Sequence, residues 1–353
     1  MLNLDNVELV KKTDALGMLD LTMGYPKQFA EGLELAQKQF QAVPKAFDHV
    51  IILGTGGGSA ASGNLLRSYL FDRMAVPLFV NQGYTVPRWV DAGTLAIVVS
   101  HSGNTEEILA ATEQAVAQGA QVVALTAGGK LKAMAEEKSF ATIEVPGGLM
   151  PRAALGYIFV PILHILEQYG LVEGCLKELD ETIALFEELG KKWGPESPFD
   201  ENLAKQIAAK LYRRVPVVYG SLPFTDSVAW RWKNQFGENS KVPAFWNAIP
   251  ALHHDEIVGW DAEGAITGQF AVIFLKDKED NEKIQKRIQI TKQILSERAS
   301  IAIEVETVGE SRLARLFSLV CLGDFISCYL PILGGIDPTP VAIIDLFKQK
   351  MGQ

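Results

Sequence analysis

A glycine-rich loop is the first part of the chain whose residue types and spacing point to chemistry. Residues 54–59 read Gly-Thr-Gly-Gly-Gly-Ser and follow a short apolar run at residues 50–53. Glycines let backbone N–H groups approach an anion closely, and the N-terminus of a following helix favours negative charge. Ser59 stands where a dinucleotide fingerprint has its third glycine, and both the acidic residue of that fingerprint and the lysine of a P-loop are missing. We therefore expect Gly57, Gly58 and Ser59 to bind a phosphate, with a simple packing turn as the alternative.

A second loop of similar chemistry follows the apolar run at residues 95–99. Residues 100–107 read Ser-His-Ser-Gly-Asn-Thr-Glu-Glu, so three hydroxyl groups gather at a strand–helix junction. One hydroxyl and an acidic first turn would be enough for an ordinary helix N-cap. Three hydroxyls, near another loop of this kind, instead favour a phosphate clamp of neutral donors made by Ser100, Ser102 and Thr105. Both loops are expected at the carboxyl ends of adjacent parallel strands, where such sheets bind ligands.

A carboxylate and a histidine in the second half of the chain could move protons. Glu238 ends a helix rich in aromatic residues, so it could be a poised base, although a solvated glutamate at a helix end is the simpler interpretation. His254 lies in the sequence His-His-Asp-Glu at residues 253–256. This cluster lacks the i, i+4 spacing of a helical zinc site, and we expect no metal there.

Two cations are further candidates. Arg152 lies in a loop just before a helix that begins near Ala153, where a lone arginine is usually solvated or ion-paired. Lys348 lies on the last expected helix with Lys350 close by, and a solvated helix face explains both lysines equally well. On the residues alone, neither cation has an assigned role.

The composition limits the partners. The 353 residues include 33 Lys and Arg against 42 Asp and Glu, a net charge of −9, which argues against nucleic acid or an anionic membrane surface as a partner but leaves small anions open. Three cysteines without a CxxC pair, and an N-terminus without a signal-peptide pattern, favour the cytoplasm. The apolar window at residues 316–335 carries Asp324 at its centre, so we expect a buried core helix rather than a membrane span.

The elements that must position these residues alternate between strands and helices. Strands are expected at 50–53, 76–80, 95–99, 122–125, 141–145, 215–219, 270–275 and 301–305. Helices are expected at 28–41, 60–70, 105–117, 130–137, 171–193, 225–237, 281–298, 311–333 and 339–350. This order predicts an α/β fold of two three-layer αβα domains, each with a mainly parallel sheet, plus terminal helices. The halves look like a degenerate duplication in which only the first half keeps the glycine-rich loop.

Taken together, the two loops resemble the sugar isomerase (SIS) domain signature, commonly S-x-S-G-N-T-x-E. More narrowly, the chain resembles the bifunctional phosphoglucose/phosphomannose isomerases of archaea and bacteria. The segments that carry this resemblance span almost the whole chain: residues 56–59, 83–87, 100–107, 151–157, 238–241, 254–260 and 337–341, with Lys348. Two positions depart from the family pattern, because Gly237 and Asp255 stand where the family usually has asparagine.

The resemblance implies an organisation and a set of roles. It implies a helical segment at 1–45, a first SIS domain at 46–193 with the phosphate loops, a linker at 194–199, a second SIS domain at 200–308, and C-terminal helices at 309–353 that complete the active site. Glu238 would be the base, Arg152 would stabilise the enediolate, and His254 and Lys348 would open the sugar ring. His254 would come from the partner of a homodimer. Thr339 would shape the pocket.

We therefore expect an isomerase that interconverts glucose 6-phosphate, and mannose 6-phosphate, with fructose 6-phosphate through a cis-enediolate, without a metal or cofactor. A non-catalytic SIS regulator that binds a phosphosugar is one alternative, and an SIS isomerase of an amino sugar phosphate is another. The regulator could dispense with Glu238, Arg152 and His254, which are all present. A nicotinamide-dependent dehydrogenase is disfavoured by the incomplete fingerprint.

Overall fold

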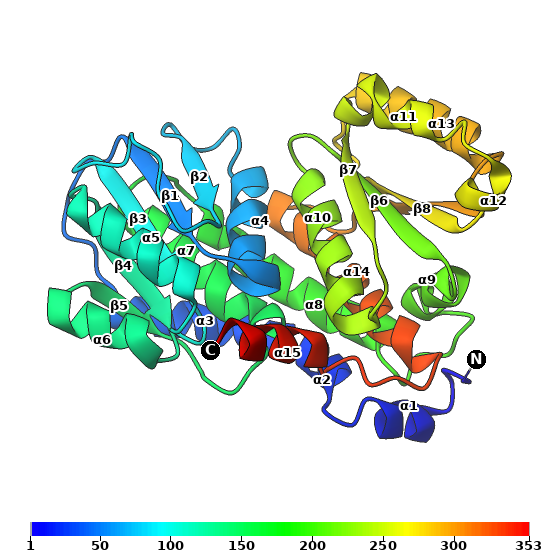
Figure 1. Cartoon of the computed structure of the whole chain (residues 1–353), viewed down its shortest axis with the longest axis horizontal. Coiled ribbons are helices and arrows are strands. Elements are labelled where there is room, and N and C mark those ends of the chain that lie inside the picture. The colour runs from blue at the N-terminus through cyan, green and yellow to red at the C-terminus, as the bar shows by residue number, and fades with distance from the viewer. Residues whose placement is uncertain (1, 353) are drawn as a thin grey trace. The chain divides into compact units, whose positions relative to one another are not determined.

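Two sheets organise the chain, whose structure is a computed structural model that describes residues 2–352 (Figure 1). Contacts within the chain divide it into two units. Residues 24–184 with 310–314 form one unit around a sheet of five strands, and the rest of the described chain forms the other around a sheet of four strands. We call them the five-strand unit and the four-strand unit and describe each by itself.

The sheet of the five-strand unit is parallel throughout. Its strands are β1 (His49–Leu53), β2 (Leu78–Asn81), β3 (Thr94–Val99), β4 (Gln121–Thr126) and β5 (Ala141–Glu144), in the order β2-β1-β3-β4-β5. Central strands of a parallel sheet are buried on both faces, and every residue of β3 is buried accordingly. The register pairs Leu53 with Val98. The loops that follow β1 and β3 therefore leave from the same edge of the sheet.

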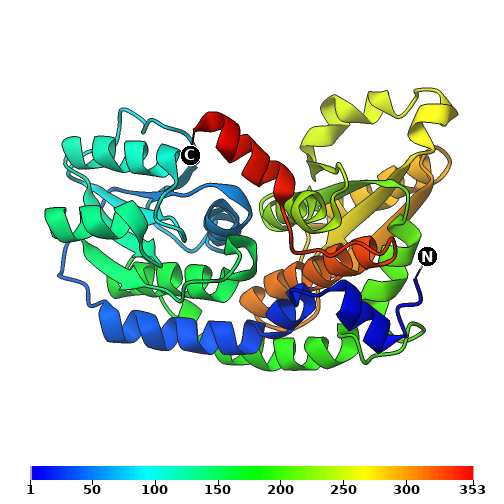
Figure 2. The same ribbon diagram turned by 60° about the horizontal axis from the view of Figure 1, so that its bottom comes forward.

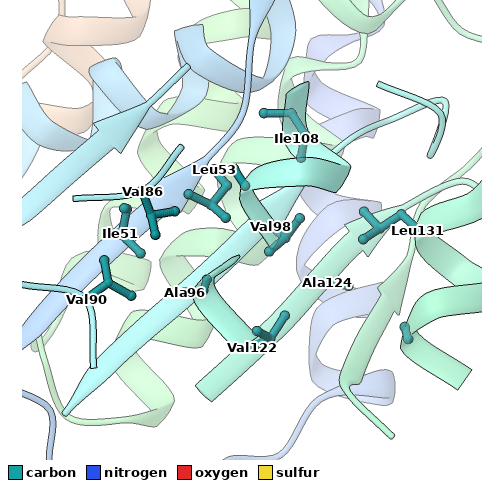
Figure 3. Close-up of a cluster of buried hydrophobic side chains, with 13 residues drawn as sticks. Ile51, Leu53, Val86, Val90, Ala96, Val98, Ile108, Val122, Ala124 and Leu131 are labelled. Atoms are coloured by element: carbon teal, nitrogen blue, oxygen red, sulfur yellow. The ribbon is translucent and has the colours of Figure 1, made fainter. Parts of the chain in front are cut away.

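Helices cover both faces of this sheet. On one face, α5 (Glu106–Ala117) and α6 (Gly129–Lys138) contribute side chains such as Ile108 and Leu131 to a core with alternate strand residues, among them Ile51 and Val98 (Figure 3). On the other face lies α4 (Ala61–Tyr69), whose Gly63 packs against Ile52. Behind it, the apolar α7 (Leu155–Gln168) packs against α3 (Tyr25–Gln39) (Figure 2).

The four-strand unit repeats the same plan. Its parallel strands are β6 (Val215–Ser221), β7 (Phe245–Ile249), β8 (Phe270–Lys276) and β9 (Ile301–Glu306), in the order β7-β6-β8-β9. This is the order β2-β1-β3-β4 without a fifth strand, as a degenerate duplication predicts. Helix α10 (Asp226–Gln235) packs against β6 and β7, and α13 (Glu282–Ser296) contributes to the core on the opposite face. The predicted fold class, α/β with two mainly parallel sheets, is confirmed.

In the described part of the chain, residues 2–352, one helix, α14 (Arg312–Ile332), is long and apolar enough by length and composition alone to cross a membrane. Its apolar window is entirely buried inside the protein. At its centre Asp324 forms a 2.7 Å ion pair with Arg231 of α10, and both side chains are almost fully buried. The expectation of a core helix is confirmed.

Some expected elements differ in the structure. The helix expected at 171–193 begins at Leu179, because Gly170 and Gly174 adopt positive φ and a short 3-10 turn precedes it. The final helix begins at Ala342 rather than at 339. The remaining helices are α1 (Val7–Thr13), α2 (Met18–Met23), α8 (Leu179–Trp193), α9 (Leu203–Leu211), α11 (Glu256–Gly259), α12 (Gly264–Thr267) and α15 (Ala342–Met351).

The domain limits expected from the sequence stay a prediction. The contact division assigns residues 185–193, which belong to α8, to the four-strand unit. Residues 2–23 belong to the four-strand unit as well, whereas residues 24–45, which include α3, belong to the five-strand unit.

Candidate functional site

The glycine-rich loop forms a single turn of π-helix, Gly56–Ala60, between β1 and α4. Gly56 enters it with a φ of 74°, which favours glycine, and Ser59 is buried at 4% exposure. The Ser62 hydroxyl donates to the Gly58 carbonyl at 3.0 Å and stabilises the end of the turn. The loop is thus an ordered, closely packed turn at the carboxyl end of the central strand β1.

The second loop, between β3 and α5, is ordered by its own hydroxyls. The hydroxyls of Ser100 and Thr105 are 2.8 Å apart, and the Ser102 hydroxyl accepts a 3.3 Å hydrogen bond from the Asn104 N–H. A hydroxyl has one donor and two acceptor sites, so the Ser100–Thr105 pair can still serve a ligand. Ser100 is buried and Ser102 is exposed, so the hydroxyls extend from the sheet edge toward solvent.

His101, between these serines, anchors the loop to the segment of Pro146. Its side chain is buried, and its Nε2 lies 3.0 Å from the Pro146 carbonyl. Burial lowers the pKa of the imidazole below its usual value of 6.5. The ring is therefore a neutral part of the loop scaffold.

Arg152 lies beside the glycine-rich loop. It belongs to a short 3-10 turn, Pro151–Ala153, and its side chain is buried at 2% exposure rather than solvated. Gly58 packs directly on the Pro151 backbone. Gln28 of α3 fixes the turn, because its side-chain amide donates to the Ala153 carbonyl at 2.8 Å. The structure thus places the turn of the buried Arg152 against the glycine-rich loop, at the same sheet edge.

At the corresponding edge of the four-strand sheet, the polar groups hydrogen-bond to one another. Here β6 leads into α10, and Ser221 at the strand end donates a 2.6 Å hydrogen bond to Asp280 in the loop after β8. The Ser221 backbone N–H donates to the Thr225 hydroxyl at 2.7 Å. Burial raises the pKa of the Asp280 carboxyl. In this second copy, an internal carboxyl therefore accepts the hydrogen bond of the Ser221 hydroxyl that a bound anion would otherwise accept.

Glu238 lies in a second π-helical turn, Phe236–Ser240, at the C-terminus of α10. Its side chain is half-buried. The next two residues anchor the turn to α14: the Asn239 amide donates to the Ser327 hydroxyl at 2.9 Å, and the Ser240 hydroxyl donates to the Ser327 carbonyl at 2.7 Å. A carboxylate held on a fixed turn can act as a base on a ligand bound beside it.

The two adjacent histidines have different surroundings. His254 ends a short 3-10 helix, Ala251–His254, and its side chain is exposed. The His253 ring lies 2.6 Å from the Thr291 hydroxyl and 3.2 Å from the Arg287 guanidinium, both on α13. His253 therefore fastens this helix to α13 and leaves His254 facing outward.

Thr339 and Lys348 follow α14 near the C-terminus of the chain. Thr339 is buried at 2% exposure, and its backbone N–H donates to the Asp337 carboxylate at 2.8 Å. Lys348 is exposed on α15, whose described residues are all exposed. Lys241 donates a 2.6 Å hydrogen bond to the Pro338 carbonyl, so the segment of Thr339 is tied to the turn of Glu238.

The two departures from the family pattern are compatible with this geometry. Gly237 is exposed, and a Cβ at that position would meet no atom within 4 Å. Asp255 is the N-cap of α11, and its carboxylate accepts a hydrogen bond from the Glu256 N–H. An asparagine oxygen at position 255 would accept the same bond.

The expected site residues thus fall into two groups. Those of the five-strand unit lie at one sheet edge: Gly57, Gly58, Ser59, Ser100, Ser102, Thr105 and Arg152. Those of the four-strand unit are Glu238, His254, Thr339 and Lys348, of which Glu238 and Thr339 lie on segments joined by Lys241. Nothing in the local sequence pattern indicates a role for Gln28, Lys241 or Ser327, since each contacts residues far along the chain. Among residues 2–352, no cluster of three or more His, Cys, Asp or Glu side chains has the arrangement of a metal site.

Two family profiles together match most of the chain. The SIS domain profile matches residues 46–149, and the profile described as bacterial phospho-glucose isomerase C-terminal SIS domain matches residues 200–351.

Curated relatives match over most of their length. A bifunctional phosphoglucose/phosphomannose isomerase of Caldicellulosiruptor bescii is 42% identical over 95% of this chain and 99% of its own. One of the same name from Aquifex aeolicus is 36% identical over 84% of this chain and 88% of its own. A D-glucosamine-6-phosphate 4-epimerase of Sulfolobus acidocaldarius is 31% identical over 57% of this chain and 60% of its own.

Solved structures share the fold. A glucose-6-phosphate isomerase-like protein of Thermus thermophilus superimposes with a TM-score of 0.62 at 22% identity, over 98% of this chain and all of that one. The C-terminal domain of glucosamine-fructose-6-phosphate aminotransferase of Francisella tularensis gives a TM-score of 0.66 at 14% identity, over 94% of this chain and 98% of that one.

Proposed function

This chain belongs to the family of bifunctional phosphoglucose/phosphomannose isomerases, and from that premise we propose that it interconverts glucose 6-phosphate and mannose 6-phosphate with fructose 6-phosphate. The observation that carries the proposal is the 42% identity to a relative of that name over 99% of the relative's length. The hydroxyl-lined loops and the buried Arg152 beside them supply what a phosphorylated sugar needs for binding.

The substrate phosphate binds to neutral donors. The hydroxyls of Ser59, Ser100, Ser102 and Thr105 and the amides of Gly57 and Gly58 hydrogen-bond its oxygens. Such donors bind a dianion without a lysine, which leaves the cations of the site for the reacting end of the sugar.

The proton transfer uses one carboxylate. Glu238 removes the proton from C2 of the open-chain aldose, the C–H electron pair forms the C1–C2 double bond of a cis-enediolate, and the carbonyl pair moves to O1. The carbon-bound proton then returns to C1, and a proton passes from O2 to O1 to give the ketose. The Arg152 guanidinium stabilises the negative charge that develops on the oxygen. Because C2 is planar in the enediolate, glucose and mannose 6-phosphates share this intermediate. Thr339 lines a pocket that admits both epimers.

Ring opening comes first. His254 and Lys348 exchange protons with the ring oxygen and the C1 hydroxyl, so that the chain form reaches Glu238. We propose that His254 serves the active site of the partner in a homodimer, which its exposed position on a short helix suits. Three buried cysteines that form no disulfide among the described residues agree with a place in the reducing cytoplasm.

A coupled assay with glucose, mannose and glucosamine 6-phosphates, without added metal or nucleotide, tests the function. Turnover of the first two supports it. Turnover of only the amino sugar phosphate would favour an amino sugar isomerase, and turnover of none a phosphosugar-binding regulator.

The variant Glu238→Gln tests the mechanism. It removes the base while keeping the size of the side chain, so turnover should disappear. Binding of glucitol 6-phosphate, which has no carbonyl to isomerise, should stay within about threefold of wild type because the phosphate contacts remain. Wild-type turnover in this variant would refute the assignment of Glu238.

A further inference from the structure

Lys241 ends the π-helical turn that carries Glu238, in a conformation that lysine rarely adopts. Its backbone lies in the left-handed region at φ 57° and ψ 33°. Its N–H caps the turn by donating to the Phe236 carbonyl. Left-handed backbone is strained for any residue with a Cβ, so glycine or asparagine would be the usual choice here. A lysine at such a position suggests that its side chain has a specific structural or functional role.

The side chain folds back over the turn and hydrogen-bonds to three backbone carbonyls. The ammonium Nζ lies 2.9 Å from the Glu238 oxygen, 3.0 Å from the Asn239 oxygen and 2.6 Å from the Pro338 oxygen. An ammonium carries three N–H donors, and its charge strengthens each of these bonds. The Pro338 carbonyl belongs to the peptide bond that precedes Thr339, so one side chain joins the turn of Glu238 to the segment of Thr339.

The other side of the turn is held by α14. Asn239 and Ser240 both hydrogen-bond to Ser327, at 2.9 Å and 2.7 Å. The peptides that follow Glu238 are therefore fixed on one side by a helix and on the other by Lys241. Without the ammonium, the Glu238 carbonyl and the residue 337–340 segment would lose their common donor.

We infer that Lys241 is a positioning residue, which fixes the backbone of Glu238 relative to Thr339 so that the carboxylate meets the proton on C2. This inference rests on the function proposed above. The inference predicts different effects on the rate of proton transfer and on the affinity for the sugar phosphate. Lys241 and Glu238 belong to the four-strand unit, whereas the loops proposed to bind the phosphate belong to the five-strand unit. Loss of the ammonium should slow proton transfer and leave the affinity for the sugar phosphate nearly unchanged.

The test compares Lys241→Met with Lys241→Cys before and after alkylation by 2-bromoethylamine. The thiolate displaces bromide and becomes an aminoethyl thioether, which restores an ammonium at the length of lysine. The reaction can be selective in the folded protein, because Lys241 is exposed whereas Cys175, Cys321 and Cys328 are buried. Lys210→Cys, at an exposed lysine of α9, receives the same treatment as the matched control.

For Lys241→Met and unmodified Lys241→Cys, we expect kcat for glucose 6-phosphate to fall about 10- to 100-fold, as for a misplaced catalytic group. The inhibition constant of glucitol 6-phosphate should stay within about threefold of wild type. Alkylation should restore most of the kcat of Lys241→Cys and leave Lys210→Cys unchanged. Mass spectrometry verifies a single adduct. If Lys241→Met does not fold, the same preparation of Lys241→Cys before and after alkylation supplies the comparison.

Three results would overturn the inference: a kcat within twofold of wild type, a loss of kcat matched by an equal loss of inhibitor affinity, or no recovery upon alkylation. Glu238→Gln is assayed in parallel. If it is inactive while Lys241→Met is fully active, only the role of Lys241 is wrong. If Glu238→Gln is active, the proposed mechanism is wrong and the inference fails with it.

Discussion

Gly58 and Pro151 lie in backbone contact so close that no side chain fits between them. A Cβ on Gly58 would overlap the Pro151 carbonyl, which immediately precedes Arg152. Gly58 and Pro151 are far apart in the chain, yet their backbones pack directly against each other. The absence of a side chain at position 58 therefore lets the glycine-rich loop pack directly on the turn that carries Arg152.

Gly58→Ala should separate these two parts of the site. We expect kcat/KM for glucose 6-phosphate to fall about 100-fold, since misplacement by about 1 Å has that order of effect. The coupled assay measures it. Gly190→Ala on α8 is the matched control, because a Cβ there meets no atom within 4 Å and alanine favours a helix. Equal activity of the two variants would contradict the role of this contact.

The buried ion pair of Arg231 and Asp324 should matter for stability. Asp324→Ala removes the carboxylate that faces the guanidinium and the acceptor of the Gln235 amide. We expect the free energy of unfolding, measured by urea denaturation, to fall by about 3–5 kcal/mol. The exposed pair of Lys11 and Glu196 is the control, and Glu196→Ala should cost less than about 1 kcal/mol. A cost for Asp324→Ala no larger than that of the control would show that the buried pair is not needed.

The neutral His101 predicts a pH dependence of stability. Its pKa is lowered by burial, so below its ordinary value of 6.5 the unfolded chain binds a proton more tightly than the native protein does. Its contribution to stability is complete above about pH 6.5 and declines as the pH falls, by at most about 1.4 kcal/mol per pH unit. His164 and His253, whose pKa values burial also lowers, add to this trend.

The variant His101→Gln should remove the contribution of His101 to the loss of stability at low pH. Urea denaturation of wild type and variant between about pH 7 and pH 5 measures it, and the variant should lose less stability than wild type. An identical pH dependence in both proteins would mean that His101 titrates normally in the native state.

The proposed contribution of His254 across a dimer interface predicts complementation between two inactive variants. Mixing Glu238→Gln with His254→Gln creates mixed dimers in which one of the two sites has both Glu238 and His254. Random reassociation should therefore restore about a quarter of wild-type activity. Each variant mixed with itself, through the same dissociation and reassociation, is the control. Absence of recovery in dimers shown to be mixed would place both groups in one subunit.

Local patterns predicted most of the strands and the two loops that follow β1 and β3, because the information lies within a few neighbouring residues. Apolar runs ended by glycine or serine mark buried parallel strands, and the structure has β1 and β3 where they were expected. Strand β7 was not predicted. It lies at a sheet edge between Pro243 and Pro250, and two of its five residues are exposed, so it lacks the continuous apolar run of a central strand.

The sequence by itself determined the fold class, the family and the residue types at the site, since glycine, hydroxyl and carboxylate chemistry is written locally and in order along the chain. Only the tertiary structure decided that Arg152 is buried and that Pro151 before it packs on Gly58, that Asp324 pairs with Arg231, and that Lys241 joins Glu238 to Pro338. The Arg231–Asp324 and Lys241–Pro338 contacts each join residues more than 90 positions apart. Such partners are set by how helices and turns pack, and no periodicity within either segment specifies them.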